Sequence, residues 1–199
     1  MKKRINSDRK KGFPGLVLFL CGFLLGNLIP NILWKMEWQQ KTIAFVYLLE
    51  IFVDRGISGR EYLLELLRMR GSYYILCTIC GCSVFGVPVA VAGTILFGAE
   101  LGSLFAMSVL SFGLSGGLVW IGLLLPQYLI YVPVTLCFMS WIFELSFGIW
   151  KNRGIFPEKA GRFAGKVILG ALIYMGGIFL ECYVNPWVAE KILGFADLF

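Results

Sequence analysis

The sequence predicts an all-α, polytopic integral membrane protein with about five transmembrane helices and further amphipathic helices at the membrane interface. Of its 199 residues, 58% are hydrophobic and only 15% are charged, more apolar surface than a soluble domain of this size can bury. Residues 104–149 form a 46-residue run in which Glu144 carries the one formal charge. Because a helical crossing needs about 20 apolar residues, this run predicts two successive crossings. We expect one membrane domain over residues 1–199.

The first predicted span covers residues 13–33, after a segment with six basic residues among the first 11. The apolar run is too long for the core of a signal peptide, and no small-residue cleavage site follows it. We therefore expect a retained span with a cytoplasmic N-terminus. Gly22 and Gly26 are four residues apart and predict a face that another helix can approach closely.

Residues 35–71 predict an extracytoplasmic amphipathic segment. Its apolar part, 42–53, is too short to cross, and the sequence leaves an interfacial and a re-entrant helix as alternatives. Ser58 and Glu61 have the spacing of a capping box for a second helix. That helix has leucines on one side and charges on the other (Leu63, Leu64, Leu66 and Leu67; Glu61, Glu65 and Arg68). We expect a surface-lying connector, with a docking platform as the alternative.

The second predicted span covers residues 73–97, with a kink at Pro88 in its interior. Cys77, Cys80 and Cys82 have a spacing similar to half of a metal site. No second cluster accompanies them, so we interpret all six cysteines as small apolar fillers.

Residues 98–103 predict a short turn that contains Glu100, the one charge between Arg70 and Glu144. An acid near a membrane helix is a candidate functional residue by default. The alternative is a boundary residue that caps the next helix, and we favour this interpretation.

The third and fourth predicted spans, 104–125 and 127–149, form a tight hairpin that turns at Pro126 and Gln127. Gln127 and the hydroxyls of Tyr128 and Tyr131 are the local partners for the carbonyls that such a turn exposes. Pro133 predicts a second bend. The third span also has glycines at 113, 116 and 117, which imply close packing or a local break.

A basic loop at 151–166 and a fifth span at 167–184 complete the prediction. Glu144 is expected to pair with Lys151 or Arg153, and Glu181 falls near the far end of the last span. The positive-inside rule then places the two basic stretches in the cytoplasm. Residues 35–71, the hairpin turn and the C-terminus are expected on the outer side.

The chain contains no histidine, which excludes Ser-His-Asp and Cys-His catalysis and any metal site that uses histidine. We expect no enzymatic activity, no catalytic residue, no cofactor and no metal. The net charge of +6 is better explained by basic residues that flank membrane helices than by nucleic-acid binding. Membrane lipid is the expected surrounding.

The stretch 125–133, Leu-Pro-Gln-Tyr-Leu-Ile-Tyr-Val-Pro, resembles the signature of the stage II sporulation protein M family of bacterial membrane proteins. The resemblance extends along the chain through its basic N-terminus, polar outer segment and glycine-rich third span. Pro126 and Pro133 match the two prolines of the family. Gln127, Tyr128 and Tyr131 stand where many wider relatives have histidine, glycine and glutamate, so an ionisable role at those positions is absent here.

The resemblance implies a non-enzymatic scaffold in the mother-cell membrane around the developing spore. There it would work in engulfment with two peptidoglycan hydrolases, the stage II sporulation proteins D and P. The hairpin motif is the candidate partner surface (Pro126, Gln127, Tyr128, Tyr131 and Pro133). The alternative function is a small-solute or ion transporter or channel subunit, with broken helices and Glu100 at a permeation site. A homo-oligomer is also left open.

Overall fold

The computed structural model describes residues 13–34, 59–152, 160–184 and 187, and every element in them is a helix. They are α1 (Gly15–Trp34), α3 (Gly59–Gly81), α4 (Gly86–Lys151) and α5 (Ala160–Tyr183). Four segments are long and apolar enough to cross a membrane: Gly15–Ile32, Gly86–Leu110, Gln127–Lys151 and Gly161–Tyr183. The prediction of an all-α, polytopic membrane protein is confirmed.

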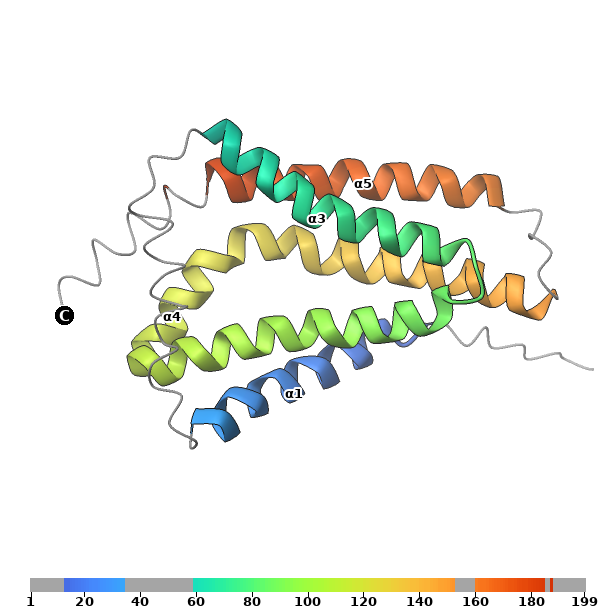
Figure 1. The fold of residues 1–199 in the computed structure, drawn as a ribbon. Helices are drawn as coiled ribbons and strands as arrows, with labels where there is room; N and C mark the ends of the chain where they lie inside the picture. Colours follow the sequence, from blue (N-terminus) through green and yellow to red (C-terminus); the bar gives the residue numbers. More distant parts are fainter. Residues whose placement is uncertain (1–12, 35–58, 153–159, 185–186, 188–199) are drawn as a thin grey trace, which may run out of the picture.

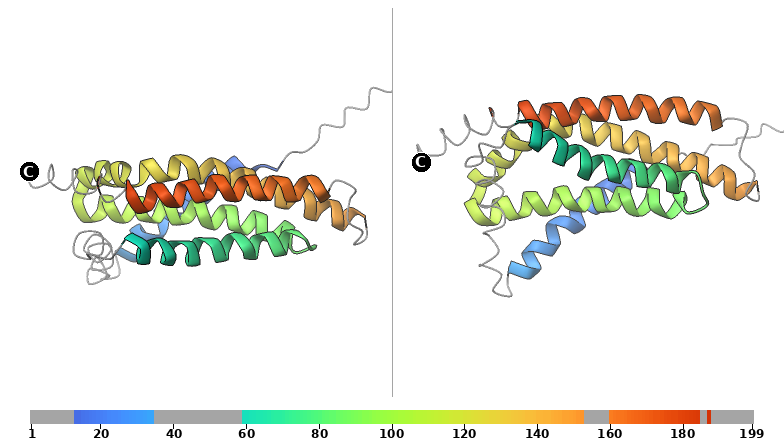
Figure 2. Two further views of the ribbon diagram at one scale, coloured as in Figure 1. Left: turned by 90° about the horizontal axis from the view of Figure 1, so that it is seen from above. Right: turned by 45° about the horizontal axis from the view of Figure 1, so that its top comes forward.

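The helices run back and forth along one bundle axis (Figure 1). At one end, here called the basic end, α1 begins, α3 ends, α4 both begins and ends, and α5 begins (Figure 2). Lys151, Arg162 and Lys166 lie towards this end. At the other, the hairpin end, α1 and α5 finish, α3 starts and α4 reverses its direction. Within the described residues the chain runs along the bundle five times, with α4 counted twice, and four of these passes are candidate membrane spans.

The predicted boundaries of the second and third spans, 73–97 and 104–125, are wrong. Helix α3 ends at Gly81, a short turn follows, and the next candidate span is Gly86–Leu110. Pro88 lies in the first turn of α4 and does not kink a helix interior. A proline fits there because the amide groups of the first turn have no helical acceptor in any case. Ser146 fixes this turn, since its hydroxyl donates to Ser83 O (2.6 Å) and accepts from Val87 N (3.1 Å).

Residues 98–103 are helical, so the turn predicted there is also wrong. The glycines have a different role, because α1 crosses the first half of α4 at this point. Gly22 and Gly26 lie against the main chain of Ile95 and Ala99, and Gly98 and Gly102 lie against that of Phe19 and Phe23. A methyl group at any of the four glycines would collide with a carbonyl of the facing helix. The close-packing face predicted from Gly22 and Gly26 is confirmed, and we call these four residues the glycine seam.

The reversal of α4 occupies residues between its two spans and is not a tight turn at Pro126 and Gln127. The backbone leaves helical geometry at Gly113, where φ is +66°, and is helical again through Pro126 and Pro133. Only glycine adopts this left-handed conformation at little cost, which explains why the break falls there. The candidate spans in α1 and, at its far end, α5 agree with the prediction, whereas the second half of α4 is already helical before Gln127.

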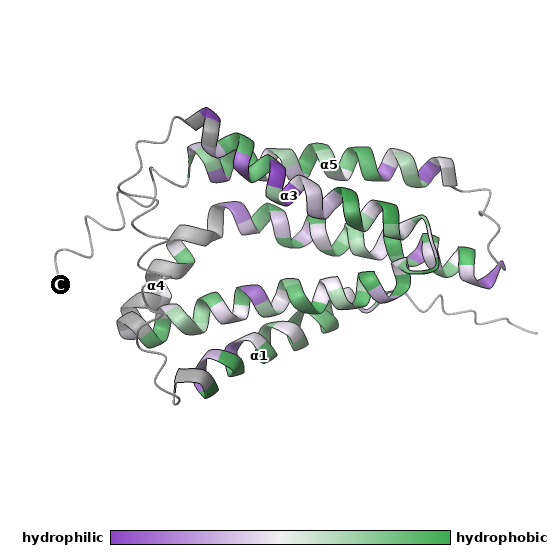
Figure 3. Ribbon diagram, in the orientation of Figure 1, coloured by the Kyte–Doolittle hydropathy of each residue, from purple (hydrophilic) through white to green (hydrophobic). Residues whose placement is uncertain are grey.

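Helix α3 contains the second part of the predicted amphipathic segment, while residues 35–58 lie outside the described residues. Polar residues are concentrated in the first half of α3 and apolar residues in its second half (Figure 3). Leu66 is buried, Leu63 and Leu67 pack against the core, and Leu64 is exposed. The predicted leucine side is thus only partly buried, and the segment is not a separate surface helix. It continues to Gly81 within the bundle, packed on α4 and α5.

Candidate functional site: a buried polar cluster at the hairpin end

An ion pair joins two helices that are distant in sequence. Arg70, in the middle of α3, donates from Nη2 to Oε1 of Glu181 near the end of α5, at 2.7 Å. The Glu181 side chain is 7% exposed and that of Arg70 is 20% exposed. Charged groups are costly among apolar helices unless they are paired, and each of these residues supplies the other's counter-charge.

Tyr131, from the second half of α4, completes the contact. Its hydroxyl donates to Oε2 of Glu181 at 2.8 Å, and its ring lies 4.6 Å from the Arg70 guanidinium carbon. Glu181 therefore accepts from two helices at once, and the Arg70 cation also interacts with the aromatic face. These contacts connect α3, α4 and α5. We call Arg70, Glu181, Tyr131 and the neighbouring Gln127 the polar cluster.

Aromatic side chains pack around the cluster. Tyr128 meets the Tyr131 ring edge-on at 5.8 Å, and the Tyr174 ring lies 4.9 Å from that of Tyr131. Farther along, Tyr74 stacks on Phe138 at 3.9 Å, and its hydroxyl donates to Val167 O at 2.9 Å. Helix α5 admits the Tyr131 ring because position 177 is glycine: a Cβ there would lie 2.6 Å from a ring carbon.

Two polar atoms of the cluster find no partner among the described residues: Arg70 Nε and Gln127 Oε1. Gln127 is only 3% exposed. A buried amide oxygen without a donor costs about 1–3 kcal/mol. The cluster thus has capacity for one further donor at Gln127 and one further acceptor at Arg70.

The hairpin motif is only partly where the sequence placed it. Gln127, Tyr128 and Tyr131 do come together on one turn of α4, but all three side chains are buried, and Tyr131 has no exposed surface. The expectation that the tyrosines lie at the outer interface is wrong, because the Tyr131 ring packs against α5 and the Tyr128 ring packs against Phe97 in the first half of α4. Pro133 is exposed, and the side chain of Pro126 lies outside what the structure describes.

The acids also differ from their predicted settings. Glu100 is exposed within the helical first half of α4 and is not a turn residue. Glu144 is exposed and lines a pocket together with Arg162 and Lys166. Among the described residues it forms no ion pair with Lys151, and Arg153 lies outside them. The sequence analysis missed the Arg70–Glu181 pair. The sequence did contain a signal for this pair, because Arg70 lies at the edge of one long apolar run and Glu181 lies inside a second one.

The cluster is suited to holding helices together. Among the described residues, no group of three His, Cys, Asp or Glu side chains is placed to hold a metal ion. Of the six cysteines interpreted as apolar fillers, Cys77 and Cys182 are buried in the core and Cys80 is half-buried. The other three are exposed on the bundle (Cys21, Cys82 and Cys137). Comparison of the sequence and structure with protein-family models, curated proteins and solved structures finds no match.

Proposed function

We propose that this chain is a non-enzymatic membrane scaffold that holds peptidoglycan hydrolases during engulfment of the forespore. The partners would be the stage II sporulation proteins D and P, as the resemblance of residues 125–133 implies. Its site is the mother-cell membrane around the forespore, with the N-terminus in the cytoplasm and the C-terminus outside.

The observation that carries the proposal is the pairing within the polar cluster. The charges of Arg70 and Glu181 are directed at each other and at Tyr131. Groups arranged in this way fix the relative positions of three helices at the hairpin end. A scaffold needs such a rigid end, because a partner gains affinity from a surface that is already ordered before binding.

The buried tyrosines change how the scaffold would act. Tyr131 cannot contact a partner directly, since its side chain is fully enclosed. It supports the hairpin end from inside, and the partner contacts belong to surfaces that the cluster positions. Exposed groups on the same part of α4 include Leu129 and Pro133.

The test is affinity purification of the tagged full-length protein from sporulating cells after mild solubilisation. We expect both hydrolases in the purified complex, and neither with an unrelated polytopic membrane protein carrying the same tag. Recovery of the scaffold at normal abundance without either hydrolase would refute the proposal.

A second function, a transporter or channel subunit, is favoured by one observation. Arg70 Nε and Gln127 Oε1 are buried without described partners. Glu100 is the one charged residue between Arg70 and Glu144 in the sequence. Ionisable groups inside a membrane bundle commonly mark ion or proton pathways. Reconstitution into liposomes distinguishes the two functions: solute or proton flux that is abolished by Glu100→Gln would support transport, and flux equal to empty liposomes would support the scaffold.

A further inference from the structure

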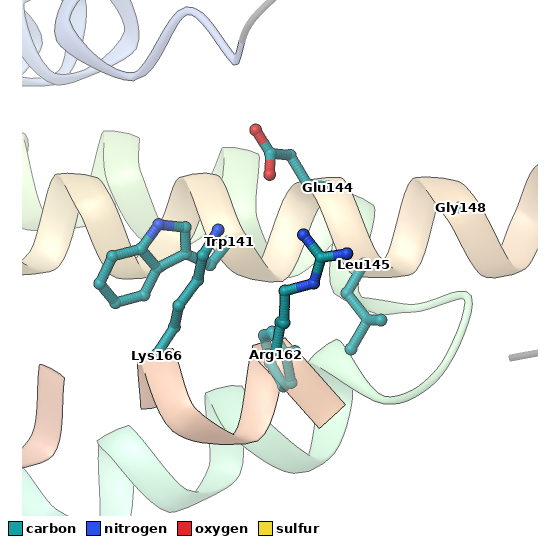
Figure 4. Close-up of a pocket in the computed structure, with 7 residues that line it drawn as sticks. Trp141, Glu144, Leu145, Gly148, Arg162 and Lys166 are labelled. Carbon is teal, nitrogen blue, oxygen red and sulfur yellow. The ribbon is translucent and has the colours of Figure 1, made fainter. Parts of the chain in front are cut away.

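A cavity of about 320 Å³ lies between the second half of α4 and the start of α5, at the basic end (Figure 4). It is far along the bundle from the polar cluster and shares no residue with it. Its lining combines basic, aromatic and aliphatic side chains: Trp141, Glu144, Leu145, Gly148, Arg162, Phe163 and Lys166. Nothing in the proposed scaffold function uses this cavity.

Two cations face the cavity from one side. Arg162 and Lys166 are four residues apart on α5 and therefore lie on the same face of that helix. Figure 4 shows both side chains extending from α5 towards α4, while the carboxylate of Glu144 points away from them. The Lys166 ammonium lies 5.6 Å from the centroid of the Trp141 ring, which holds it over the cavity wall. The lining residues carry a net charge of +1, from two bases and one acid.

The depth of these cations matches a lipid headgroup. Lys166 is five residues into the candidate span Gly161–Tyr183, or about 7.5 Å at the helical rise of about 1.5 Å per residue. Long basic side chains at this depth reach the headgroup layer while their stems stay in apolar surroundings. Directly beyond Lys166, Ile168, Leu169 and Leu172 are exposed on α5. An anion bound at the two cations would thus have an apolar helix surface beside it.

We propose that this cavity binds the phosphate headgroup of an anionic phospholipid in the leaflet at the basic end, with the acyl chains along the exposed face of α5. A phosphate diester of such a lipid offers acceptor oxygens to Arg162 and Lys166. Leu145 and Phe163 contact the glycerol and the first methylenes. A basic pocket between membrane helices on the cytoplasmic side is the expected form of an anionic-lipid site. A free phosphate would meet the same cations and gain nothing from the apolar part.

The experiment uses the purified full-length protein in a neutral detergent, with lipid binding measured by native mass spectrometry. Phosphatidylglycerol, phosphatidylcholine of matched acyl chains and inorganic phosphate are titrated separately. We expect phosphatidylglycerol to bind more tightly than phosphatidylcholine. Arg162→Gln and Lys166→Gln should each weaken phosphatidylglycerol binding about five-fold, the usual contribution of one basic side chain at an anionic lipid surface.

Two further variants make the result decisive. Lys151→Gln removes one positive charge from the same end without changing the cavity lining, so it should leave lipid binding unchanged. Glu144→Gln removes the acid at the rim and should strengthen phosphatidylglycerol binding, an outcome that loss of folding cannot imitate. Equal effects of Lys151→Gln and Lys166→Gln, equal binding of the two lipids, or binding of inorganic phosphate as tight as that of phosphatidylglycerol would each overturn the proposal.

Discussion

The two main helix contacts of this bundle are built in opposite ways. Where α1 crosses the first half of α4, the glycine seam brings main chain against main chain. Where α3 and α5 meet the second half of α4, large tyrosine rings separate the helices, and the polar cluster joins them. The first contact is stabilised by the close packing of two backbones. The second is stabilised by an ion pair that lies mostly buried between the helices.

The difference follows from the solvent. Lipid chains are as apolar as leucine, so helices in a bilayer gain little from simply covering apolar side chains. Small residues and interhelical hydrogen bonds are the two remaining means of association. A glycine contact is sensitive to added volume, whereas a buried ion pair is sensitive to an unbalanced charge. The two regions should therefore respond to different classes of mutation.

The largest effect is expected from unbalancing the polar cluster. Glu181→Leu leaves the Arg70 cation buried without its counter-charge, which costs about 3–5 kcal/mol of unfolding free energy. The measurement is unfolding by a denaturing detergent in mixed micelles. The matched control is Arg70→Leu combined with Glu181→Leu, which removes both charges and should recover most of the loss. If the double variant were as unstable as Glu181→Leu, the attraction between the two charges would stabilise the bundle, and the cost of one unpaired charge would not explain the loss.

An intermediate effect is expected at the glycine seam. Gly98→Ala places a methyl group against the Phe19 carbonyl, a main-chain atom that cannot move without displacing α1. Overpacking of this kind costs about 1–3 kcal/mol. Gly176→Ala is the matched control, because a Cβ at Gly176 meets nothing within 4 Å in the described structure. The same unfolding assay should separate the two variants, and equal stability would mean that α1 does not cross α4 as described.

The smallest effect is expected for Tyr131→Phe. The substitution keeps the ring that packs on Tyr174 and Arg70 and removes only the hydroxyl that donates to Glu181. Interhelical hydrogen bonds in membrane proteins contribute about 0.6–2 kcal/mol. Adding Tyr131→Phe to the variant that lacks both charges should cost almost nothing, since Glu181 is then absent. A full additive loss in that background would place the hydroxyl's role outside the polar cluster.

The sequence predicted the structure correctly where the prediction depended on a long apolar run or on regularly spaced small residues. The first span and the close-packing face at Gly22 and Gly26 agree with the structure. The prediction failed between residues 73 and 125 because hydrophobicity there is nearly continuous. Glycine and proline mark both turns and helix contacts, and only the position of α1 shows that Gly98 belongs to a contact while Gly113 belongs to the reversal.

The polar cluster could not be predicted in the same way. Arg70 and Glu181 are 111 residues apart, and no local pattern pairs them. Tyr128 and Tyr131 suited an interfacial aromatic belt by their chemistry, and the burial of Tyr131 depends on the glycine at 177 in a different helix. Such contacts are set by tertiary packing. A base and an acid that have no oppositely charged neighbour in their own apolar helices do indicate that each needs a partner elsewhere in the chain.

The central claim of the proposed scaffold function is that the polar cluster acts by fixing three helices and not by the chemistry of its charges. The direct measurement is co-purification of the two hydrolases, normalised to membrane abundance, with wild type, Glu181→Leu and the Arg70→Leu, Glu181→Leu double variant. The account predicts loss of both partners in the single variant and substantial recovery in the double variant, where balance and packing return. Failure of the double variant to bind partners, despite normal abundance and restored stability, would contradict it and assign a functional role to the charges themselves.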